Sequence, residues 1–310
     1  MRLHLGEQPL EGEALVAAAE GCALIVSYRQ SPAPASLFDS LPGLVAFLRC
    51  AVDIRNVDVA AASRAGVLVT QASAGFVPAV AELVFGFLID LSRGISHSGA
   101  TYRAGGIPAA RSGKHLRGSV LGVIGYGAIG REVARIGVAF GMRVLVCDPH
   151  VKVAPQGVEQ PGIEQPGIEQ LGFDALLANA DYVVPLAVAT PETENLMDAA
   201  AFAKMKSGAF FVNVSRGNLV DEVALEAALA SRRIAACALD VGRAPDQMPT
   251  PRLAALDRVI ATPHVGGLTP QAIEHQSLET AAQAAEIGAG RAPKGAVNAE
   301  YWTRQELLGK

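Results

Sequence analysis

The sequence has 310 residues, of which half are apolar and 18% are charged, and its formal net charge is −4 at neutral pH. This length and composition predict two domains with substantial hydrophobic cores. Lysine and arginine residues are dispersed along the chain, which argues against a nucleic-acid-binding surface and a polybasic membrane patch. The N-terminal segment carries acidic residues where a signal peptide needs an apolar stretch. We therefore expect a protein that binds neither nucleic acid nor membrane.

The four cysteines, Cys22, Cys50, Cys147 and Cys237, lie far apart in the sequence. They form no C-x-x-C pair and show no metal-ligand spacing, and three of them lie in apolar, strand-like runs. We expect reduced thiols in a cytoplasmic protein, and no metal site.

The first 95 residues alternate apolar runs with helical patterns. Strands are expected at Cys22–Val26, Leu44–Leu48 and Val67–Thr70, and helices at Val57–Arg64 and Val77–Arg93. The last of these is the most apolar helix expected in the chain, but its charged residues indicate a buried helix rather than a membrane span. The alternation predicts a small α/β domain.

The most informative segment, residues 120–150, places a Gly-x-Gly-x-x-Gly motif between two apolar runs. The run Val120–Ile124 precedes Gly125, Gly127 and Gly130, and a helical pattern then leads to the run Arg143–Cys147. The first glycine permits a tight turn, the second lets a pyrophosphate approach the backbone, and the third lets helix and strand pack closely. N–H groups at the helix start would face the phosphates. The segment predicts a dinucleotide site; the alternative is a glycine-rich turn that binds nothing.

An aspartate closes the second apolar run of this segment. Asp148 follows Gly125 by 23 positions, near the ~20-residue offset at which an acidic side chain accepts hydrogen bonds from the adenosine ribose. Its negative charge would repel a 2′-phosphate, so NAD is favoured over NADP. The alternative is an aspartate that caps a turn before Pro149.

After Asp148 the alternation continues to the end of the chain. Strands are expected at Tyr182–Val188, Phe210–Val214, Ala235–Val241 and Arg258–Ala261, with a helix at Asp221–Ser231. A final helix, from residue 270 to residue 290, is expected to pack back on the first domain and make it discontinuous. The expected domains are therefore a discontinuous substrate-binding domain of residues 1–95 with 270–310, and a nucleotide-binding domain of residues 96–269.

Residues 157–171 form a tandem five-residue repeat, GVEQP-GIEQP-GIEQL. Pro161 and Pro166 exclude a regular helix or a central strand through the repeat. We interpret it as a surface-loop expansion.

Three polar residues follow or end successive expected strands. Arg216 follows the strand at residues 210–214, Asp240 lies near the end of the next one, and His264 follows the last one. Ligands of an open parallel sheet bind at the carboxyl ends of its strands, which is also where the glycine-rich turn lies. A guanidinium can clamp a carboxylate, and a histidine can give or take a hydroxyl proton. Taken singly, Arg216 could be a surface ion pair and His264 a capped loop histidine.

With these residues in place, the chain resembles the D-isomer-specific 2-hydroxyacid dehydrogenase family, which includes phosphoglycerate dehydrogenase. The resemblance covers nearly the whole chain. It rests on AVAELVFGFLIDLSR (79–93), the unit 125–148, TPETENL (190–196), MKSGAFFVNVSRGNLVDEVALEAAL (205–229), ALDV (238–241) and TPHVGG (262–267).

The resemblance implies an α/β protein with two Rossmann-like, doubly wound parallel-sheet domains, the first flavodoxin-like, and an active-site cleft between them. It also implies a homodimer that acts on a small-molecule substrate. Arg216 would bind the substrate carboxylate, His264 would be the acid/base, and Asp240 would hold the nicotinamide carboxamide. The residues expected to bind the cofactor are Gly125, Tyr126, Gly127, Ala128, Ile129, Gly130, Asp148, Thr190, Ser215, Arg216, Asp240, His264 and Gly266.

The sequence departs from the family pattern at the residue expected to pair with the histidine. The pattern places a glutamate five residues after the aspartate of ALDV, where this chain has Pro245. Asp246 could substitute for it if the loop shifts by one residue.

Two further departures lie at positions expected to face the substrate. The substrate loop reads Ala51-Val52-Asp53, where the family shows Gly-x-Gly, and Arg49 or Arg55 could offset the charge of Asp53. The segment LAVAT (186–190) replaces a His-x-Pro pattern, which gives the nicotinamide an apolar wall.

Together these features predict an NAD-dependent oxidoreductase that acts on CH–OH groups and transfers a hydride between the nicotinamide and a small 2-hydroxy or 2-keto acid. Two alternatives are an NAD(H)-binding regulatory module with little catalysis, and a dehydrogenase of this fold with an atypical substrate. The departures at residues 51–53, 186–188 and 245 favour these alternatives, whereas Arg216 and His264 favour the enzyme.

Overall fold

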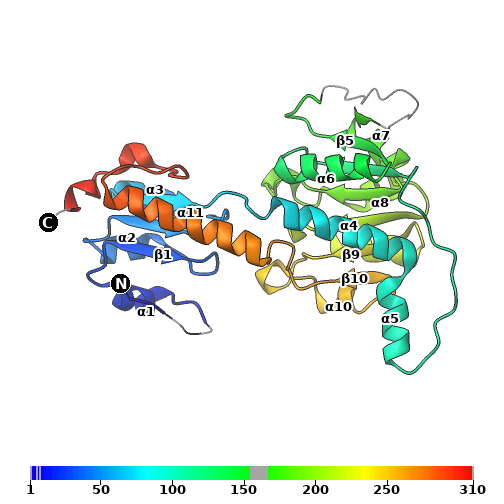
Figure 1. Ribbon diagram of the computed structural model, residues 1–310, viewed down its shortest axis with the longest axis horizontal. Helices are drawn as coiled ribbons and strands as arrows, with labels where there is room; N and C mark the ends of the chain where they lie inside the picture. The colour runs from blue at the N-terminus through cyan, green and yellow to red at the C-terminus, as the bar shows by residue number, and fades with distance from the viewer. Residues whose placement is uncertain (1, 5, 7, 154–166, 309–310) are drawn as a thin grey trace. The chain divides into compact units, whose positions relative to one another are not determined.

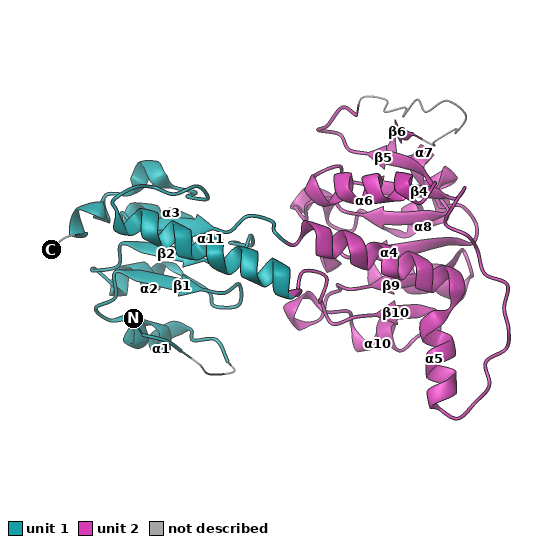
Figure 2. Cartoon of the chain, viewed as in Figure 1, with its two compact units in different colours: residues 1–75, 270–310 teal, residues 76–269 magenta. Residues whose placement is uncertain are grey.

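The computed structural model describes residues 2–4, 6, 8–153 and 167–308. The chain divides into two compact units, Met1–Gly75 with Pro270–Lys310 (unit 1) and Phe76–Thr269 (unit 2), which Figure 2 shows in different colours. In the described part of the chain, no helix is long and apolar enough to cross a membrane.

Unit 1 is built on a parallel sheet with the strand order β1-β2-β3. Figure 1 labels β1 of this sheet and the helices of the unit. Residues alternate between the two faces of a strand, and both faces of this sheet are covered. Phe47 packs in a cluster with residues of α1, α2 and α3, whereas Ala46 and Leu48 pack with Ile287 of α11 and with Trp302. The elements of unit 1 are α1 (Gly12–Ala19), β1 (Leu24–Ser27), α2 (Ala35–Ser40), β2 (Ala46–Arg49), α3 (Val59–Arg64), β3 (Leu68–Gln71), α11 (Pro270–Gly288), η4 (Ala299–Tyr301) and η5 (Arg304–Leu307).

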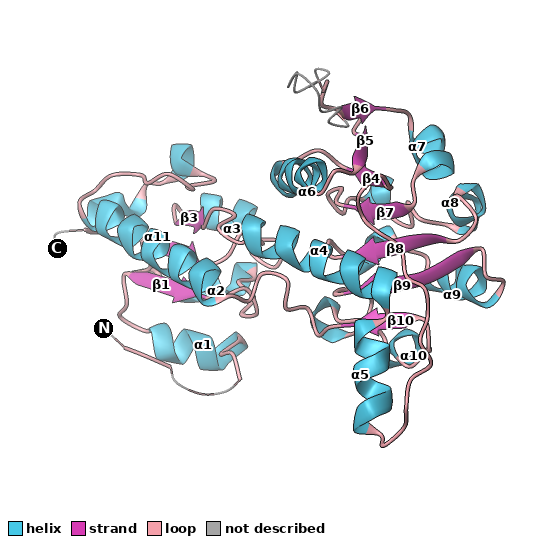
Figure 3. Cartoon of the chain, turned by 45° about the vertical axis from the view of Figure 1, so that its right-hand side comes forward, coloured by secondary structure: helices cyan, strands magenta, loops and turns pink. Residues whose placement is uncertain are grey.

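Unit 2 contains a seven-stranded parallel sheet with the order β10-β9-β8-β7-β4-β5-β6 (Figure 3). Helices α4 and α6 cover one face, and α7, α8 and α9 cover the other. The strand order reverses between β4 and β7, the place where doubly wound sheets bind their ligands. The elements are α4 (Val77–Arg93), α5 (Ile95–Arg103), β4 (Val120–Ile124), α6 (Ala128–Ala139), β5 (Arg143–Cys147), β6 (Ile168–Gln170), α7 (Phe173–Asn179), β7 (Tyr182–Pro185), η1 (Pro191–Thr193), α8 (Ala199–Lys204), β8 (Ala209–Asn213), η2 (Gly217–Leu219), α9 (Glu222–Ala230), β9 (Ile234–Leu239), η3 (Pro245–Gln247), α10 (Pro251–Ala254) and β10 (Val259–Ala261).

The predicted α/β class with parallel sheets is confirmed. The first boundary between the compact units differs from the expected one, because it falls at residues 75 and 76 and not at residue 95. Helix α4 accounts for the difference, since its buried residues, including Val84 and Leu88, share a hydrophobic cluster with Leu121 and Val123 of β4.

The last copy of the five-residue repeat contributes to the sheet of unit 2. Its residues Ile168–Gln170 form β6, which pairs with β5 at the edge of the sheet. The interpretation of the whole repeat as a surface loop is therefore wrong for this last copy. An edge strand is compatible with the preceding Pro166. The first two copies lie outside the described residues.

Candidate functional site

The glycine-rich turn follows β4 and leads directly into α6. Gly125 has a φ of +98°, which side-chain-bearing residues rarely adopt, and a Cβ there would lie 2.7 Å from the backbone N of Ala187. A Cβ on Gly130 would lie 2.1 Å from the carbonyl oxygen of Gly125. A Cβ on Gly127 would meet no atom of the described residues within 4 Å. Two glycines are thus required for close backbone packing, and the third leaves open space.

Gly127 is the N-cap of α6, so the open space lies at the positive end of a helix of twelve residues. The first N–H groups of a helix have no partner within it, and together with the helix dipole they favour an anion. Ala128 and Ile129 belong to this first turn. Tyr126 is buried, and the guanidinium of Arg131 lies 4.6 Å from its ring centre. These residues fit the pyrophosphate of a dinucleotide.

Asp148 lies just after β5, beside the glycine-rich turn. Its Oδ2 accepts a hydrogen bond from the N–H of Tyr126 at 2.7 Å, and its Oδ1 accepts one from the N–H of His150 at 2.8 Å. Burial raises the pKa of Asp148, but hydrogen bonds from the N–H groups of Tyr126, His150 and Val151 outweigh that effect, and the pKa is lowered. The carboxylate is therefore ionised at neutral pH and held next to the turn.

The loop after β7 forms the other side of the point where the strand order reverses. Leu186 donates its N–H to the carbonyl of Ile124 at 2.6 Å, and the Ser215 hydroxyl donates to the carbonyl of Ala187 at 3.1 Å. Val188 is 77% exposed, and the exposed Thr190 is the N-cap of η1. Thr190 and Ser215 thus lie on loops that follow neighbouring strands of this sheet.

Arg216 follows β8, and contacts of its backbone fix its position. The backbone carbonyl of Arg216 accepts a hydrogen bond from the side chain of Asn213 at 2.9 Å. The guanidinium of Arg216 donates from Nη1 to the carbonyl of Ser215 at 2.7 Å. The next residue, Gly217, is packed so closely that a Cβ would lie 2.0 Å from the carbonyl oxygen of Gly242. The backbone at Arg216 is therefore held between two loops.

Asp240 is buried at the end of β9, where it holds the loop that carries His264. Its Oδ1 accepts hydrogen bonds from the Thr262 hydroxyl at 2.6 Å and from the N–H of Val265 at 2.8 Å. Its Oδ2 accepts one from the N–H of the buried Gly266 at 2.8 Å. Asp240 thus positions the 262–266 loop, and the role toward the nicotinamide that the resemblance implies stays a prediction.

His264 follows β10 and is half-buried, with a φ of +56° that is uncommon outside glycine, asparagine and aspartate. Its N–H donates to the carbonyl of Asp240 at 2.9 Å, and its Nδ1 lies 2.7 Å from the carbonyl oxygen of Asp246. Because a carbonyl oxygen can only accept, Nδ1 carries a proton, and Nε2 is the nitrogen that gains or loses one. In this contact Asp246 presents its main-chain carbonyl, and the substitution of its carboxylate for the family glutamate stays a prediction.

The predicted substrate loop belongs to unit 1, after β2. Ala51 is buried, and Val52 and Asp53 are half-buried. Asp53 forms an ion pair with Arg55 at 2.6 Å, so Arg55 is one of the two arginines that offset its charge.

Arg49, the last residue of β2, is fully buried and holds neighbouring segments of unit 1. It donates to the carbonyls of Tyr28 and Ser31 and to Oδ1 of Asn56, the last two at 2.8 Å and 2.9 Å. Burial lowers the pKa of the Arg49 guanidinium to about 10, although the negative charge of Asp53 acts in the opposite direction. Arg49 is thus an internal cation that ties the end of β2 to the segment at residues 28–31 and to Asn56.

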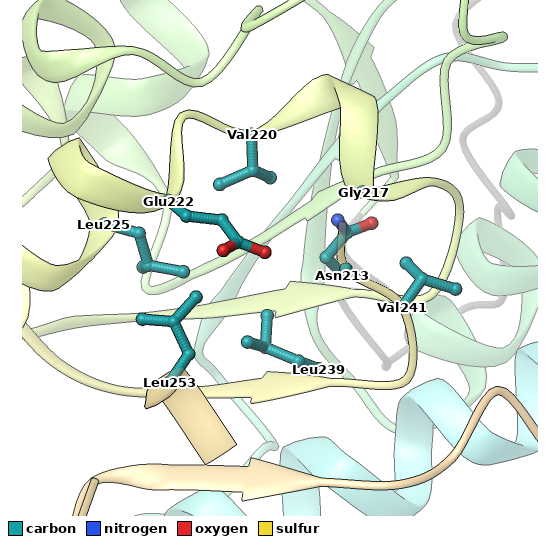
Figure 4. Close-up of a pocket in the computed structure, with 9 residues that line it drawn as sticks. Asn213, Gly217, Val220, Glu222, Leu225, Leu239, Val241 and Leu253 are labelled. Atoms are coloured by element: carbon teal, nitrogen blue, oxygen red, sulfur yellow. The ribbon is translucent and has the colours of Figure 1, made fainter. Parts of the chain in front are cut away.

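A small pocket lies beneath the ends of β8 and β9 (Figure 4). It has room for little more than a water molecule, so neither a dinucleotide nor a keto acid fits there. Its lining residues are Asn213, Gly217, Val220, Glu222, Leu225, Leu239, Val241, Gly242 and Leu253.

Comparison with known proteins identifies the family. The model of the D-isomer specific 2-hydroxyacid dehydrogenase NAD binding domain matches residues 85–266. A D-3-phosphoglycerate dehydrogenase of Mycobacterium leprae is 36% identical over 290 residues, which cover 92% of this chain and 53% of that protein. A hydroxypyruvate reductase of Thermotoga maritima is 30% identical over 280 residues, which cover 89% of this chain and 88% of that protein.

A solved structure supports the same grouping. The apo structure of D-lactate dehydrogenase from Escherichia coli matches with a TM-score of 0.79 at 28% identity, covering 91% of this chain and 88% of that chain. The chain spans about half the length of the curated phosphoglycerate dehydrogenases that it matches. The resemblance drawn from the motifs is confirmed, and this chain belongs to the D-isomer specific 2-hydroxyacid dehydrogenase family.

Proposed function

We propose that this protein is an NAD-dependent oxidoreductase that acts on a small 2-hydroxy or 2-keto acid. The observation that carries the proposal is that the glycine-rich turn, Arg216 and His264 follow β4, β8 and β10 at the carboxyl edge of one parallel sheet. The nicotinamide of bound NAD supplies or accepts the hydride. Arg216 clamps the substrate carboxylate, and Nε2 of His264 gives a proton to the carbonyl oxygen during reduction or takes it during oxidation.

The direct test is oxidation of NADH and NADPH with a panel of 2-keto acids: glyoxylate, hydroxypyruvate, pyruvate and a branched analogue. Turnover of one of these acids supports the enzyme. Tight NADH binding without turnover of any acid would instead favour an NAD(H)-binding regulatory module, for which the replacement of the family glutamate by Pro245 is the specific observation. Turnover of only a bulky acid would indicate an atypical substrate.

Asp148 supports NAD over NADP, because an ionised carboxylate beside the turn repels a 2′-phosphate. Replacing Asp148 with asparagine keeps the shape and removes the charge. We expect the ratio of kcat/KM for NADH to kcat/KM for NADPH to fall by about tenfold, which corresponds to about 1.4 kcal/mol. Steady-state kinetics with both cofactors measure this ratio. The control is Asp174→Asn, which removes the charge of an exposed aspartate on α7. An unchanged ratio would remove Asp148 from cofactor choice.

A homodimer is supported by helix α5 and the segment that follows it. None of the residues of α5 is buried, and Ile95, Tyr102 and Ile107 are 58%, 63% and 89% exposed. Exposed apolar side chains on a helix and on the segment that follows it are typical of an interface. We expect wild-type protein to sediment at twice the mass of one chain, and Tyr102→Asp at the mass of one chain. The matched control is Tyr301→Asp, since Tyr301 of unit 1 is 54% exposed. A wild-type monomer would contradict the proposal.

A cytoplasmic location is supported by the cysteines. All four are free in the structure, and Cys237 is buried, where burial raises the pKa of its thiol. Free thiols are typical of proteins in a reducing compartment.

A further inference from the structure

Arg243, in the loop after β9, makes contacts that sequence reasoning did not anticipate. Its Nη2 donates to Oδ1 of Asn195 at 2.6 Å and lies 2.9 Å from Oε1 of Glu194. Both partners belong to the TPETENL motif in the loop after β7, in which Thr190 is the residue expected to bind the cofactor and Glu194 and Asn195 have no expected role. Asn195 has a φ of +54°, so the backbone at this contact is held in an uncommon conformation.

The same guanidinium also contacts the loop after β8. Nη2 donates to the carbonyls of Asn218 at 3.2 Å and Val220 at 3.1 Å, and Nε donates to the carbonyl of Val220 at 3.2 Å. The two loops are joined directly as well, because Asn218 donates to Glu194 at 3.1 Å and Asn195 donates its N–H to the carbonyl of Asn218 at 2.8 Å. Hydrogen bonds from Asn218 and Arg243 lower the pKa of Glu194. A planar guanidinium with several fixed donors is suited to such a junction.

The loop that carries Arg243 reaches the surroundings of both proposed catalytic residues. Gln247 accepts a hydrogen bond at Oε1 from the N–H of Gly217, next to Arg216, at 3.3 Å, and its carbonyl accepts one from Gly242 at 2.8 Å. Its neighbour Asp246 accepts the hydrogen bond from Nδ1 of His264. The N–H of Arg243 itself donates to Glu222 at 3.1 Å. This single loop therefore links the residue after Arg216 to the imidazole of His264.

We propose that Arg243 is a positioning residue that fixes the loops after β7, β8 and β9, and thereby sets the distance between Arg216 and His264. The inference rests on the proposed function, in which these two residues act on one substrate. The contacts of Arg243 include neither the glycine-rich turn nor Asp148, so we expect its loss to affect the reaction far more than the binding of NADH. A lysine cannot replace it, because one ammonium cannot reach both neighbouring loops with the geometry of the guanidinium.

The test compares Arg243→Met, Arg243→Lys and Glu194→Gln with the control Arg252→Met. Arg252 forms an ion pair with Glu226 between α10 and α9, and its side-chain hydrogen bond goes to Glu226 and not to these loops. We expect kcat per NADH-binding site, counted by fluorescence titration, to fall by about 10- to 100-fold in Arg243→Met, because small displacements of catalytic groups have effects of that size. Arg243→Lys should fall nearly as far and Glu194→Gln less, while Kd for NADH stays within about threefold in every variant.

A second readout does not depend on turnover. Hydrogen exchange of amides in residues 186–196 and 214–221 should become faster in Arg243→Met and stay unchanged in Arg252→Met, since local opening exposes amides. Unchanged exchange, or a kcat within about twofold of wild type in both Arg243 variants, would overturn the inference. Faster exchange in a protein that reduces none of the acids of the panel would instead overturn the proposed function and leave the loop junction in place.

Discussion

Replacing His264 with asparagine is expected to lower kcat for the fastest 2-keto acid by about 100- to 10,000-fold, the usual contribution of a positioned general acid or base. Asparagine tolerates the positive φ of this residue and can still donate a hydrogen bond to the carbonyl of Asp246, but it cannot transfer a proton. The variant therefore removes the acid/base function and keeps the loop.

The measurement is the steady-state kcat with the fastest 2-keto acid, combined with a fluorescence titration of NADH. Kd for NADH should change by less than about threefold, because the glycine-rich turn is untouched. His264→Ala should lose as much activity and also some stability, since alanine is less tolerant of positive φ. His115→Ala, in an exposed loop position, is the control. Full activity of His264→Asn would show that another group moves the proton.

The second large effect concerns two glycines of the same motif, which should respond in opposite ways. Gly127→Ala adds a methyl group to open space, so the fold should keep its stability, but the methyl group blocks the approach of the pyrophosphate. We expect Kd for NADH to rise by about 10- to 100-fold, which is about 1.4–2.8 kcal/mol.

Gly130→Ala places a methyl group 2.1 Å from the carbonyl oxygen of Gly125, so the helix must move away from the strand. Overpacking of this kind typically costs about 1–3 kcal/mol, so we expect the free energy of unfolding to fall by about 1 kcal/mol or more. Urea titration of both variants, with and without NADH, separates the two effects. Equal loss of stability in both variants, or normal NADH affinity in Gly127→Ala, would contradict a site built on this turn.

Much of the fold follows from local sequence patterns. Helix α4 begins and ends where predicted because a proline stands in its first turn and Gly94 ends it with a φ of +66°. The domain boundary could not be placed in the same way, because an apolar helix face does not show which sheet it covers. Helix α5 was not predicted, for a related reason. Because it buries no residue, its sequence shows no apolar periodicity.

The same difference applies to the candidate site, where some residues could be predicted from the sequence and some contacts could not. Gly125–Gly130, Asp148 and the strand-end residues could be found because each is fixed by the position of a strand in the sheet. The contacts of Arg243 could not, since Glu194, Asn218 and Arg243 lie on three different loops and meet only after folding. The hydrogen bond from His264 to the carbonyl of Asp246 involves a residue with a φ of +56° and a ψ of +28°, a conformation that no motif encodes.

The buried carboxylate of Asp240 has a thermodynamic consequence for binding. Its three hydrogen bonds arrange the 262–266 loop during folding, so the conformational entropy of this loop is already lost before any ligand arrives. A ligand that contacts His264 therefore does not have to order this loop on binding. Less of its interaction energy is lost to ordering the protein, and its affinity is higher. The calorimetric entropy of substrate binding should accordingly be less unfavourable than for a site whose histidine loop orders only around its substrate.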